Sequence, residues 1–294
     1  MDKPKTVKLT AGDQTFYVII NLFLILIGVA IAIPMWSTIT QSFRPNDFIG
    51  SNLEGMFLAP WKWKTDAYSA LLGNNGFISA FWNSIKIMVF GTFTALCLTV
   101  PMAYCMSVHD LPGRKILNYF VIIPYLFNIG LVPTYLVIKN LGLIDHIAAV
   151  FIPGAIGTYN CLIMRGFFEG IPESLKESAR IDGAAEWYVL VSIILPLSKP
   201  IIMTIGLYYA VNFWNDYMHP MLYLKTLKPL PILLRDILMA SGMSEYVESN
   251  AFGEAPVQAI KAASVFMSAI PMMMAYPFIQ KYFTKGTMLG SVKG

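Results

Sequence analysis

Long apolar blocks with almost no charge are the feature that most restricts how this chain can fold. Of its 294 residues, 56% are hydrophobic and only 13% are charged, whereas soluble domains usually carry about 25% charged residues. Several of the blocks reach the roughly 20 residues that cross the hydrocarbon core of a membrane. Because such a chain cannot cover itself with a water-compatible surface, the sequence predicts an all-α polytopic membrane protein.

The blocks predict six transmembrane helices. They cover roughly residues 16–40, 77–106, 117–138, 147–168, 200–224 and 259–283. We therefore divide the chain into an N-terminal segment (1–15), a transmembrane domain (16–283) and a C-terminal tail (284–294). The first block is too long for the apolar part of a cleaved signal peptide, so we expect it to remain as the first span.

The positive charges predict the orientation, because Lys and Arg favour cytoplasmic loops. With six spans both termini lie on one side, and twelve basic residues fall there: Lys3, Lys5, Lys8, Arg114, Lys115, Arg165, Lys176, Arg180, Lys199, Lys281, Lys285 and Lys293. Seven fall on the other side: Arg44, Lys62, Lys64, Lys139, Lys225, Lys228 and Arg235. We expect both termini in the cytoplasm of a cell-membrane protein.

Two further patterns leave alternatives open. The long outer loops, 41–76 and 225–258, either receive an extracytoplasmic partner or serve as plain connectors. Helix-disturbing residues interrupt or lie within three spans: Gly91, Pro101, Pro124, Pro133, Pro271 and Pro277. Proline removes a backbone donor, and membranes tolerate this where neighbours or a water-filled path satisfy the freed carbonyls. These positions indicate either a gated pathway or fixed kinks.

A short charged helix is predicted between the fourth and fifth spans, over residues 172–183. Pro172 suits the first helical position, Glu173 suits the helix dipole, and Gly183 can adopt the positive φ of a helix end. Glu177 and Arg180 are spaced to pair along the helix. An isolated helix this short is marginal in water, and its weak apolar face predicts packing against a protein partner more than lipid.

This segment resembles the EAA loop of ABC-importer permeases. Glu177-Ser178-Ala179, Asp182-Gly183-Ala184 and Ile194-Leu195-Pro196 match its three parts, with Ser178 where the family favours Ala. Asn83-Ser84, Trp214-Asn215-Asp216 and the ending from Tyr282 resemble further elements of MalG-type carbohydrate permeases. The resemblance covers about residues 15–294 and is greatest to the LplC-like branch, which includes importers of acidic oligosaccharides of the alginate or pectin kind.

The resemblance implies a type I ABC-importer permease fold in which the loop at 169–199 carries a coupling helix that docks on an ATPase. The implied contact residues are Glu177, Ser178, Ala179, Asp182 and Gly183. The implied partners are two ATPase subunits that hold ATP and Mg, a second related permease, an extracytoplasmic solute-binding protein and an oligosaccharide. No cofactor is expected on this chain.

Polar and aromatic residues within the spans are candidates for the substrate path, because buried polar groups in a membrane are costly and often functional. The candidates are Tyr208, Tyr209, Asn212, Trp214, Asn215, Asp216, Tyr125 and Asn128. Aromatic faces with amide and carboxylate groups suit a sugar. The alternative is that these groups bond between helices and fix the bundle.

Other function classes find little support in the sequence. It has no GxxxxGK[ST] phosphate loop, so ATP hydrolysis is not expected on this chain, and its scattered basic residues do not form a nucleic-acid stripe. The three histidines and three cysteines lack metal-ligand spacing. Two alternatives remain: a self-contained secondary transporter, for which only Asp216 offers an intramembrane carboxylate, and a polytopic membrane enzyme.

Overall fold

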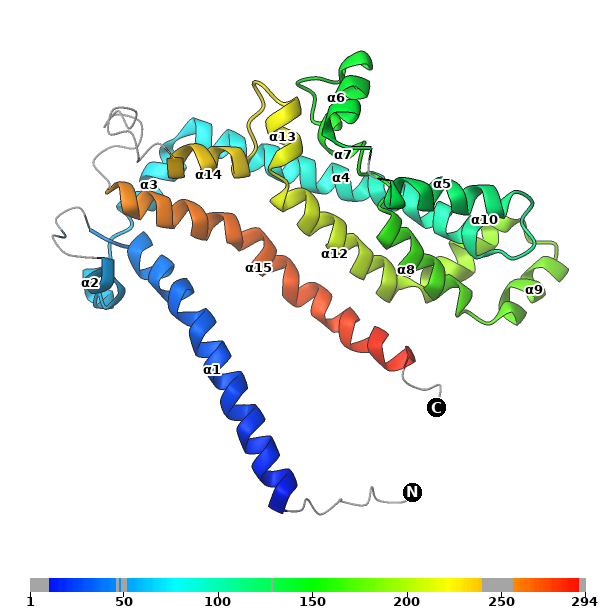
Figure 1. The fold of residues 1–294 in the computed structure, drawn as a ribbon, viewed down its shortest axis with the longest axis horizontal. Coiled ribbons are helices and arrows are strands. Elements are labelled where there is room, and N and C mark those ends of the chain that lie inside the picture. Colours follow the sequence, from blue (N-terminus) through cyan, green and yellow to red (C-terminus); the bar gives the residue numbers. More distant parts are fainter. Residues whose placement is uncertain (1–10, 46–47, 49–51, 128, 240–255, 291–294) are drawn as a thin grey trace. The chain divides into compact units, whose positions relative to one another are not determined.

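The computed structural model describes residues 11–45, 48, 52–127, 129–239 and 256–290 (Figure 1). Within these ranges the regular structure is helical and includes no strand. The chain divides into two compact units, residues 1–73 with 244–267 and residues 74–243 with 268–294. The helix α15 (Val257–Gly290) begins in the first unit and ends in the second.

The first unit is built around one long apolar helix. Its elements are α1 (Ala11–Ser42), α2 (Asn52–Met56), the 3₁₀ helix η1 (Pro60–Lys62), α3 (Asp66–Gly73) and the first part of α15. The most apolar window of α1 has none of its residues buried, as expected for a helix that is hydrophobic all round. Beyond its end, Phe43 stacks on Trp63 with ring centroids 4.9 Å apart.

The second unit holds most of the remaining helices. They are α4 (Asn75–Ser107), α5 (Arg114–Leu126), α6 (Leu131–Asn140), α7 (Ala148–Phe151), α8 (Thr158–Glu169), α9 (Glu173–Ile181), α10 (Glu186–Tyr188), the π-helical segment η2 (Val189–Ile194), α11 (Leu195–Leu197), α12 (Lys199–Asn215), α13 (Met218–Tyr223) and α14 (Leu230–Met239). In Figure 1, α4 and α12 run side by side, and α8 packs against both.

Close packing of α4 on α12 depends on a glycine. A Cβ atom at Gly91 would lie 2.9 Å from the ring of Phe213 and 3.0 Å from the Cβ of Phe151. The absence of a side chain therefore lets these helices approach. Farther along α4, the Thr99 and Tyr209 hydroxyls lie 2.7 Å apart in the buried core.

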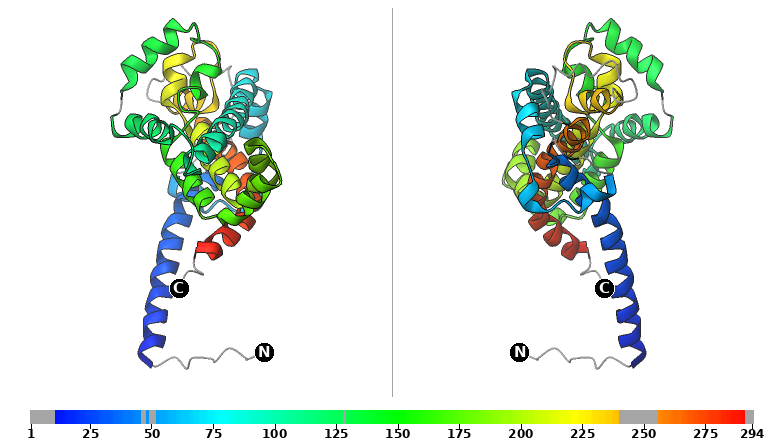
Figure 2. Two further views of the ribbon diagram at one scale, coloured as in Figure 1. Left: turned by 90° about the vertical axis from the view of Figure 1, so that its right-hand side faces the viewer. Right: turned by 90° about the vertical axis from the view of Figure 1, so that its left-hand side faces the viewer.

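The predicted apolar blocks correspond to helices, although several blocks are broken. Within the described residues, three helices are long and apolar enough to cross a membrane, and up to five spans result if each of two bent pairs counts as one. One pair is α5 with α6, whose change of direction is visible in Figure 2; in the other, Glu186–Leu197 meets α12 at 84°. The block at 147–168 is split into α7 and α8, so the number of six spans stays a prediction.

The residues predicted to interrupt the spans all lie inside helices. The third block does break, between α5 and α6, but Pro124 lies within α5 and Pro133 within α6, so neither proline marks the break. The helix α4 continues through Gly91 and Pro101. The sixth block likewise stays helical through Pro271 and Pro277. Neighbouring turns continue the helix past each isolated proline, so residue type alone does not locate a break.

Candidate functional site

The short charged helix α9 forms as predicted, within slightly narrower limits. It spans Glu173–Ile181, nine residues, and Pro172 is its N-cap rather than its first helical residue. At the other end Gly183 has φ +81°. The Gly183 N–H donates to Arg180 O at 3.0 Å and the Ala184 N–H to Ala179 O at 2.9 Å, the bond pattern of a Schellman helix end.

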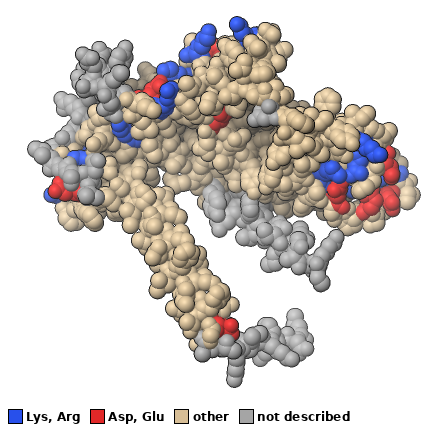
Figure 3. Space-filling view, viewed as in Figure 1, with Lys and Arg blue, Asp and Glu red and all other residues tan. Residues whose placement is uncertain are grey.

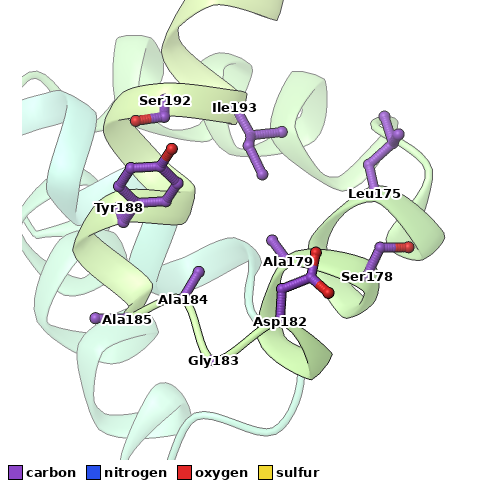
Figure 4. Close-up of a pocket in the computed structure, with 10 residues that line it drawn as sticks. All are labelled: Leu175, Ser178, Ala179, Asp182, Gly183, Ala184, Ala185, Tyr188, Ser192 and Ile193. Atoms are coloured by element: carbon purple, nitrogen blue, oxygen red, sulfur yellow. The ribbon is translucent and has the colours of Figure 1, made fainter.

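The outward side of α9 carries most of the predicted coupling residues. Glu177, Ser178 and Asp182 are exposed, and Ala179 is half-buried. Beside the helix lies an open groove of about 750 Å³. Figure 4 shows its lining, which comes from α9, the Gly183 turn and the start of the following helix: Leu175, Ser178, Ala179, Asp182, Gly183, Ala184, Ala185, Tyr188, Ser192 and Ile193.

The predicted pair between Glu177 and Arg180 is wrong. Arg180 instead donates from Nε to Glu186 Oε1 at 2.7 Å and from a terminal nitrogen to Glu173 Oε1 at 3.2 Å. The Glu173 Oε2 atom accepts from Lys176 Nζ at 2.9 Å. Arg180 therefore faces along the helix toward Glu173 and across the turn toward Glu186, which leaves Glu177 exposed on the other side.

The two basic residues of this segment, Lys176 and Arg180, pair with carboxylates of the segment itself, and its charges gather at the end of the second unit that bears α9 (Figure 3). A hydrogen bond from Lys176 lowers the pKa of Glu173, and one from Arg180 lowers the pKa of Glu186. The Lys176 side chain is 2% exposed. A buried ammonium requires such a partner, so Glu173 has a structural role that the sequence pattern did not reveal.

The predicted substrate-path residues separate into two groups on α12. Tyr208, Asn212 and Asn215 are exposed and follow one another at i, i+4 and i+7, so they form a single stripe. Tyr209 and Trp214 are buried. The Tyr209 hydroxyl accepts from the Gly157 N–H at 2.8 Å, and the Trp214 indole donates to Ser268 O at 3.1 Å. The polar atoms of Tyr209 and Trp214 are thus bonded to other groups of this chain.

The other candidates lie at helix ends. Asp216 is the C-cap of α12, accepts from the His219 N–H at 3.3 Å, and has its second oxygen 2.9 Å from His219 Nδ1. Asp216 thereby links α12 to α13. Tyr125 is exposed on α5, whereas Asn128 lies outside the described residues.

Sequence reasoning missed a second set of contacts, near the third turn of α4. We name it the outer latch, after the side of the membrane on which the positive charges of the sequence predict it to lie: Asp145 binds Lys225 and Thr226, while Asn83 and Ser84 bind Lys228 and Leu230. Asn83 Nδ2 donates to Lys228 O at 3.3 Å, and the Leu230 N–H donates to Ser84 Oγ at 2.8 Å. The Asn-Ser pair noted in the sequence therefore fastens the loop that follows α13.

Asp145 fastens the same loop from another side. Its Oδ1 accepts from the Lys225 and Thr226 N–H groups at 2.8 and 2.9 Å, and its Oδ2 accepts from the Thr226 hydroxyl at 2.7 Å. These bonds, first of all that from the Thr226 amide, lower its pKa to about 2. Its φ of +65° is one that Asp tolerates better than most residues, which was the available sequence signal.

These features define a membrane permease component: apolar helices long enough to span, with an exposed charged helix projecting from one unit. The chain belongs to the family of binding-protein-dependent transport system inner membrane components, whose model matches residues 75–287. This confirms the all-α importer-permease fold and the membrane location. It also agrees with a transport component rather than an enzyme.

Curated relatives match nearly the whole chain. The polygalacturonan/rhamnogalacturonan transport system permease protein YtcP of Bacillus subtilis (strain 168) is 38% identical over 286 residues, which cover 96% of this chain and 99% of YtcP. Protein LplC of the same organism is 37% identical over 289 residues, 97% of each chain. The chain is therefore similar along nearly its whole length to a polysaccharide transport permease and to LplC.

A solved structure shows the same arrangement of helices. It comes from a bacterial ABC transporter involved in the import of the acidic polysaccharide alginate, and it matches with a TM-score of 0.85 at 28% identity. The match covers 95% of this chain and all of the other chain. Together with the family, this similarity shows that the chain is a permease of the ABC-importer kind.

Proposed function

We propose that this chain is one of two permease subunits of an ABC importer that carries an acidic oligosaccharide into the cell. The observation that carries the coupling part of the proposal is the exposed side of α9, with Glu177, Ser178 and Asp182 free of the bundle and Gly183 closing the helix. A nine-residue helix this exposed needs a partner to pack against. The partner we assign is a separate ATPase subunit, which supplies ATP and Mg.

The substrate class rests on the relatives and on the stripe of α12. YtcP is named for polygalacturonan and rhamnogalacturonan, and the solved relative for alginate; galacturonan and alginate are built from uronic acids. Tyr208, Asn212 and Asn215 offer an aromatic ring and two amides on one exposed side of a helix. We assign this stripe, more than the buried Tyr209 and Trp214, to the oligosaccharide path.

The remaining partners follow from the transport class. The family name refers to a binding protein, and we assign it to the outer side, where it would release the oligosaccharide. The stripe of α12 is open on this chain, so a second, related permease is needed to enclose the path. In this proposal both termini and α9 lie in the cytoplasm.

The docking role is tested with Gly183→Asp and Glu177→Lys. Each variant should remain in the membrane with its partner permease but lose ATPase co-purification and ATP-driven uptake. The matched control is Gly113→Asp, because Gly113 has φ +83° and, like Gly183, no atom within 4 Å of an added Cβ. Unchanged ATPase binding and uptake in both α9 variants would refute the assignment.

The substrate is tested by uptake of labelled uronic-acid oligosaccharides into proteoliposomes that hold the whole complex and its binding protein. Uptake should require ATP inside, and Asn212→Ala with Asn215→Ala should reduce it while ATPase co-purification is retained. Tyr119→Phe, on the exposed side of α5, serves as a control. Transport of neutral oligosaccharides alone would overturn the acidic class, and ATP-independent uptake would favour a secondary transporter.

A further inference from the structure

One carboxylate joins the charged helix α9 to the long helix α4. Glu186 Oε2 accepts from the Tyr104 hydroxyl on α4 at 2.6 Å, and its Oε1 accepts from Arg180 Nε on α9 at 2.7 Å. Arg180 also reaches Glu173, which in turn holds Lys176. We call these linked side chains the inner brace: Tyr104, Glu186, Arg180, Glu173 and Lys176.

The inner brace is buried at its two ends and exposed in its middle. Tyr104 is 5% exposed, and its ring meets that of Phe168 edge-on with centroids 6.5 Å apart. The Lys176 side chain at the far end is 2% exposed. Between them the side chains of Arg180 and Glu186 are 31% and 54% exposed. Both ends are thus fixed by the protein interior, and the link between them is polar.

Folding stability does not account for this link, because exposed ion pairs contribute little to it. Orientation does. The apolar side chains of α9 and its turn that pack on the core include only the small Ala179 and Ala184, which offer little area to fix how α9 is rotated. The planar guanidinium of Arg180, with a carboxylate on each side, supplies a defined geometry that such small side chains cannot.

The brace and the docking surface are separate sets of residues. Glu177, Ser178 and Asp182 lie on the exposed side of α9, and the brace uses Glu173, Lys176 and Arg180. A change in Glu186 or Tyr104 therefore alters how α9 is tied to α4 without altering what α9 presents to a partner. This separation makes attachment and transmission distinguishable by experiment.

We propose that Glu186 is a positioning residue that transmits the movement of α9 to α4 through Tyr104 and Arg180. The inference rests on the proposed docking of an ATPase on α9. When the ATPase displaces α9, the brace makes α4 follow, and through α4 the packed helices α12 and α8. Without the brace, α9 moves with the ATPase but α4, α12 and α8 do not follow it.

The test compares Glu186→Gln, Tyr104→Phe and the double variant in the complete complex. Each should co-purify the ATPase as the wild type does and hydrolyse ATP. The number of oligosaccharides transported per ATP should fall about fivefold or more, the lower range of a typical coupling between sites. Asp110→Asn is the matched control: it removes the same charge from an exposed residue just beyond the end of α4.

The double variant separates transmission from general damage. If Tyr104 and Glu186 act through their shared hydrogen bond, the double variant should be no more uncoupled than Glu186→Gln alone. A wild-type transport-to-ATP ratio in both single variants would overturn the proposal. So would loss of ATPase co-purification in both, because the brace would then maintain the docking surface itself.

The outcome is also distinguishable from failure of the docking proposal. If Gly183→Asp and Glu177→Lys keep the ATPase bound, the assignment of α9 fails and the brace inference fails with it. If those variants lose the ATPase while Glu186→Gln stays fully coupled, docking stands and only the brace inference is refuted.

Discussion

Two sites on α4, one in its third turn and one in its last turn, are fastened in opposite ways. At the outer latch, Asp145, Asn83 and Ser84 bind mainly backbone groups of the loop at 225–230. At the inner brace, every bond joins one side chain to another. On one side α4 therefore contacts a loop whose own main chain is bound. On the other side it contacts the α9 segment, which is bound only through long side chains.

The difference bears on what each site can do. A loop whose backbone N–H groups are bound cannot shift without losing those bonds, and the buried Leu230 N–H is costly to leave unpaired. The bonds of the inner brace join α9 and α4 without using the main chain of either helix, so the two helices can shift together while these bonds stay intact. We infer that the outer latch holds a fixed loop, whereas the inner brace can transmit a displacement without breaking.

The largest expected effect comes from Gly91→Val, which should loosen both sites together. The added side chain would overlap with the ring of Phe213 and the Cβ of Phe151. Overpacking of this kind costs about 1–3 kcal/mol or more. Thermal unfolding in detergent should show the loss. Gly166→Val, in α8 with no atom within 4 Å of its added Cβ, is the control. Equal losses in both would contradict the packing role of Gly91.

Next in size is Asp145→Ala, which should open the outer latch only. The variant removes the acceptor of three hydrogen bonds and places Ala at φ +65°. Hydrogen exchange at the Lys225 and Thr226 amides should accelerate, while exchange within α9 stays as in the wild type. Asp145→Asn, which tolerates the same φ and keeps one acceptor oxygen, should give an intermediate rate. Protected amides in the Ala variant would refute the latch.

A smaller effect is expected for the stability of Glu186→Gln. Because the side chain is 54% exposed, loss of its ion pair should change the free energy of unfolding by about 1 kcal/mol or less. The thermal midpoint of the purified complex measures this. A loss as large as that of Gly91→Val would mean that the inner brace supports folding rather than transmission.

The smallest effect is expected from pH within the physiological range. The pKa of Asp145 is lowered to about 2 and the pKa values of Glu173 and Glu186 are lowered as well. Since folding depresses these values, their stabilising contribution is complete above about pH 5 and is lost as the pH falls through the folded values. Amide protection at Thr226 should stay level from pH 8 to 5. A loss near pH 6 would exclude Asp145 as the acceptor.

The helix α9 was predictable because its signals are local. Pro172 and Glu173 at its start and Gly183 at its end act through the backbone alone, and the helix forms within two residues of its expected limits. The partner of Arg180 was not predictable in the same way. Helical spacing favours Glu177, but Glu186 comes within reach only after the chain reverses at Gly183.

The stripe on α12 shows a second limit of sequence reasoning. Tyr208 and Tyr209 are adjacent and chemically identical, yet one is exposed and the other is buried against Thr99. The packing of α12 on α4 decides between them, and the positions of apolar residues along α12 do not reveal which side is covered. Asp145 was missed for a related reason, since its partners lie 80 residues away in the sequence.

The length of α4 also sets the distance between the outer latch and the inner brace. Ser84 and Tyr104 lie on one continuous helix, twenty residues and so about 30 Å apart, which equals the thickness of the hydrocarbon core. The outer latch and the inner brace are therefore separated along α4 by about the thickness of the hydrocarbon core. Lys86, exposed two residues beyond Ser84, has a side chain long enough to extend its ammonium group toward lipid headgroups, which would help to fix the position of α4 along the bilayer normal.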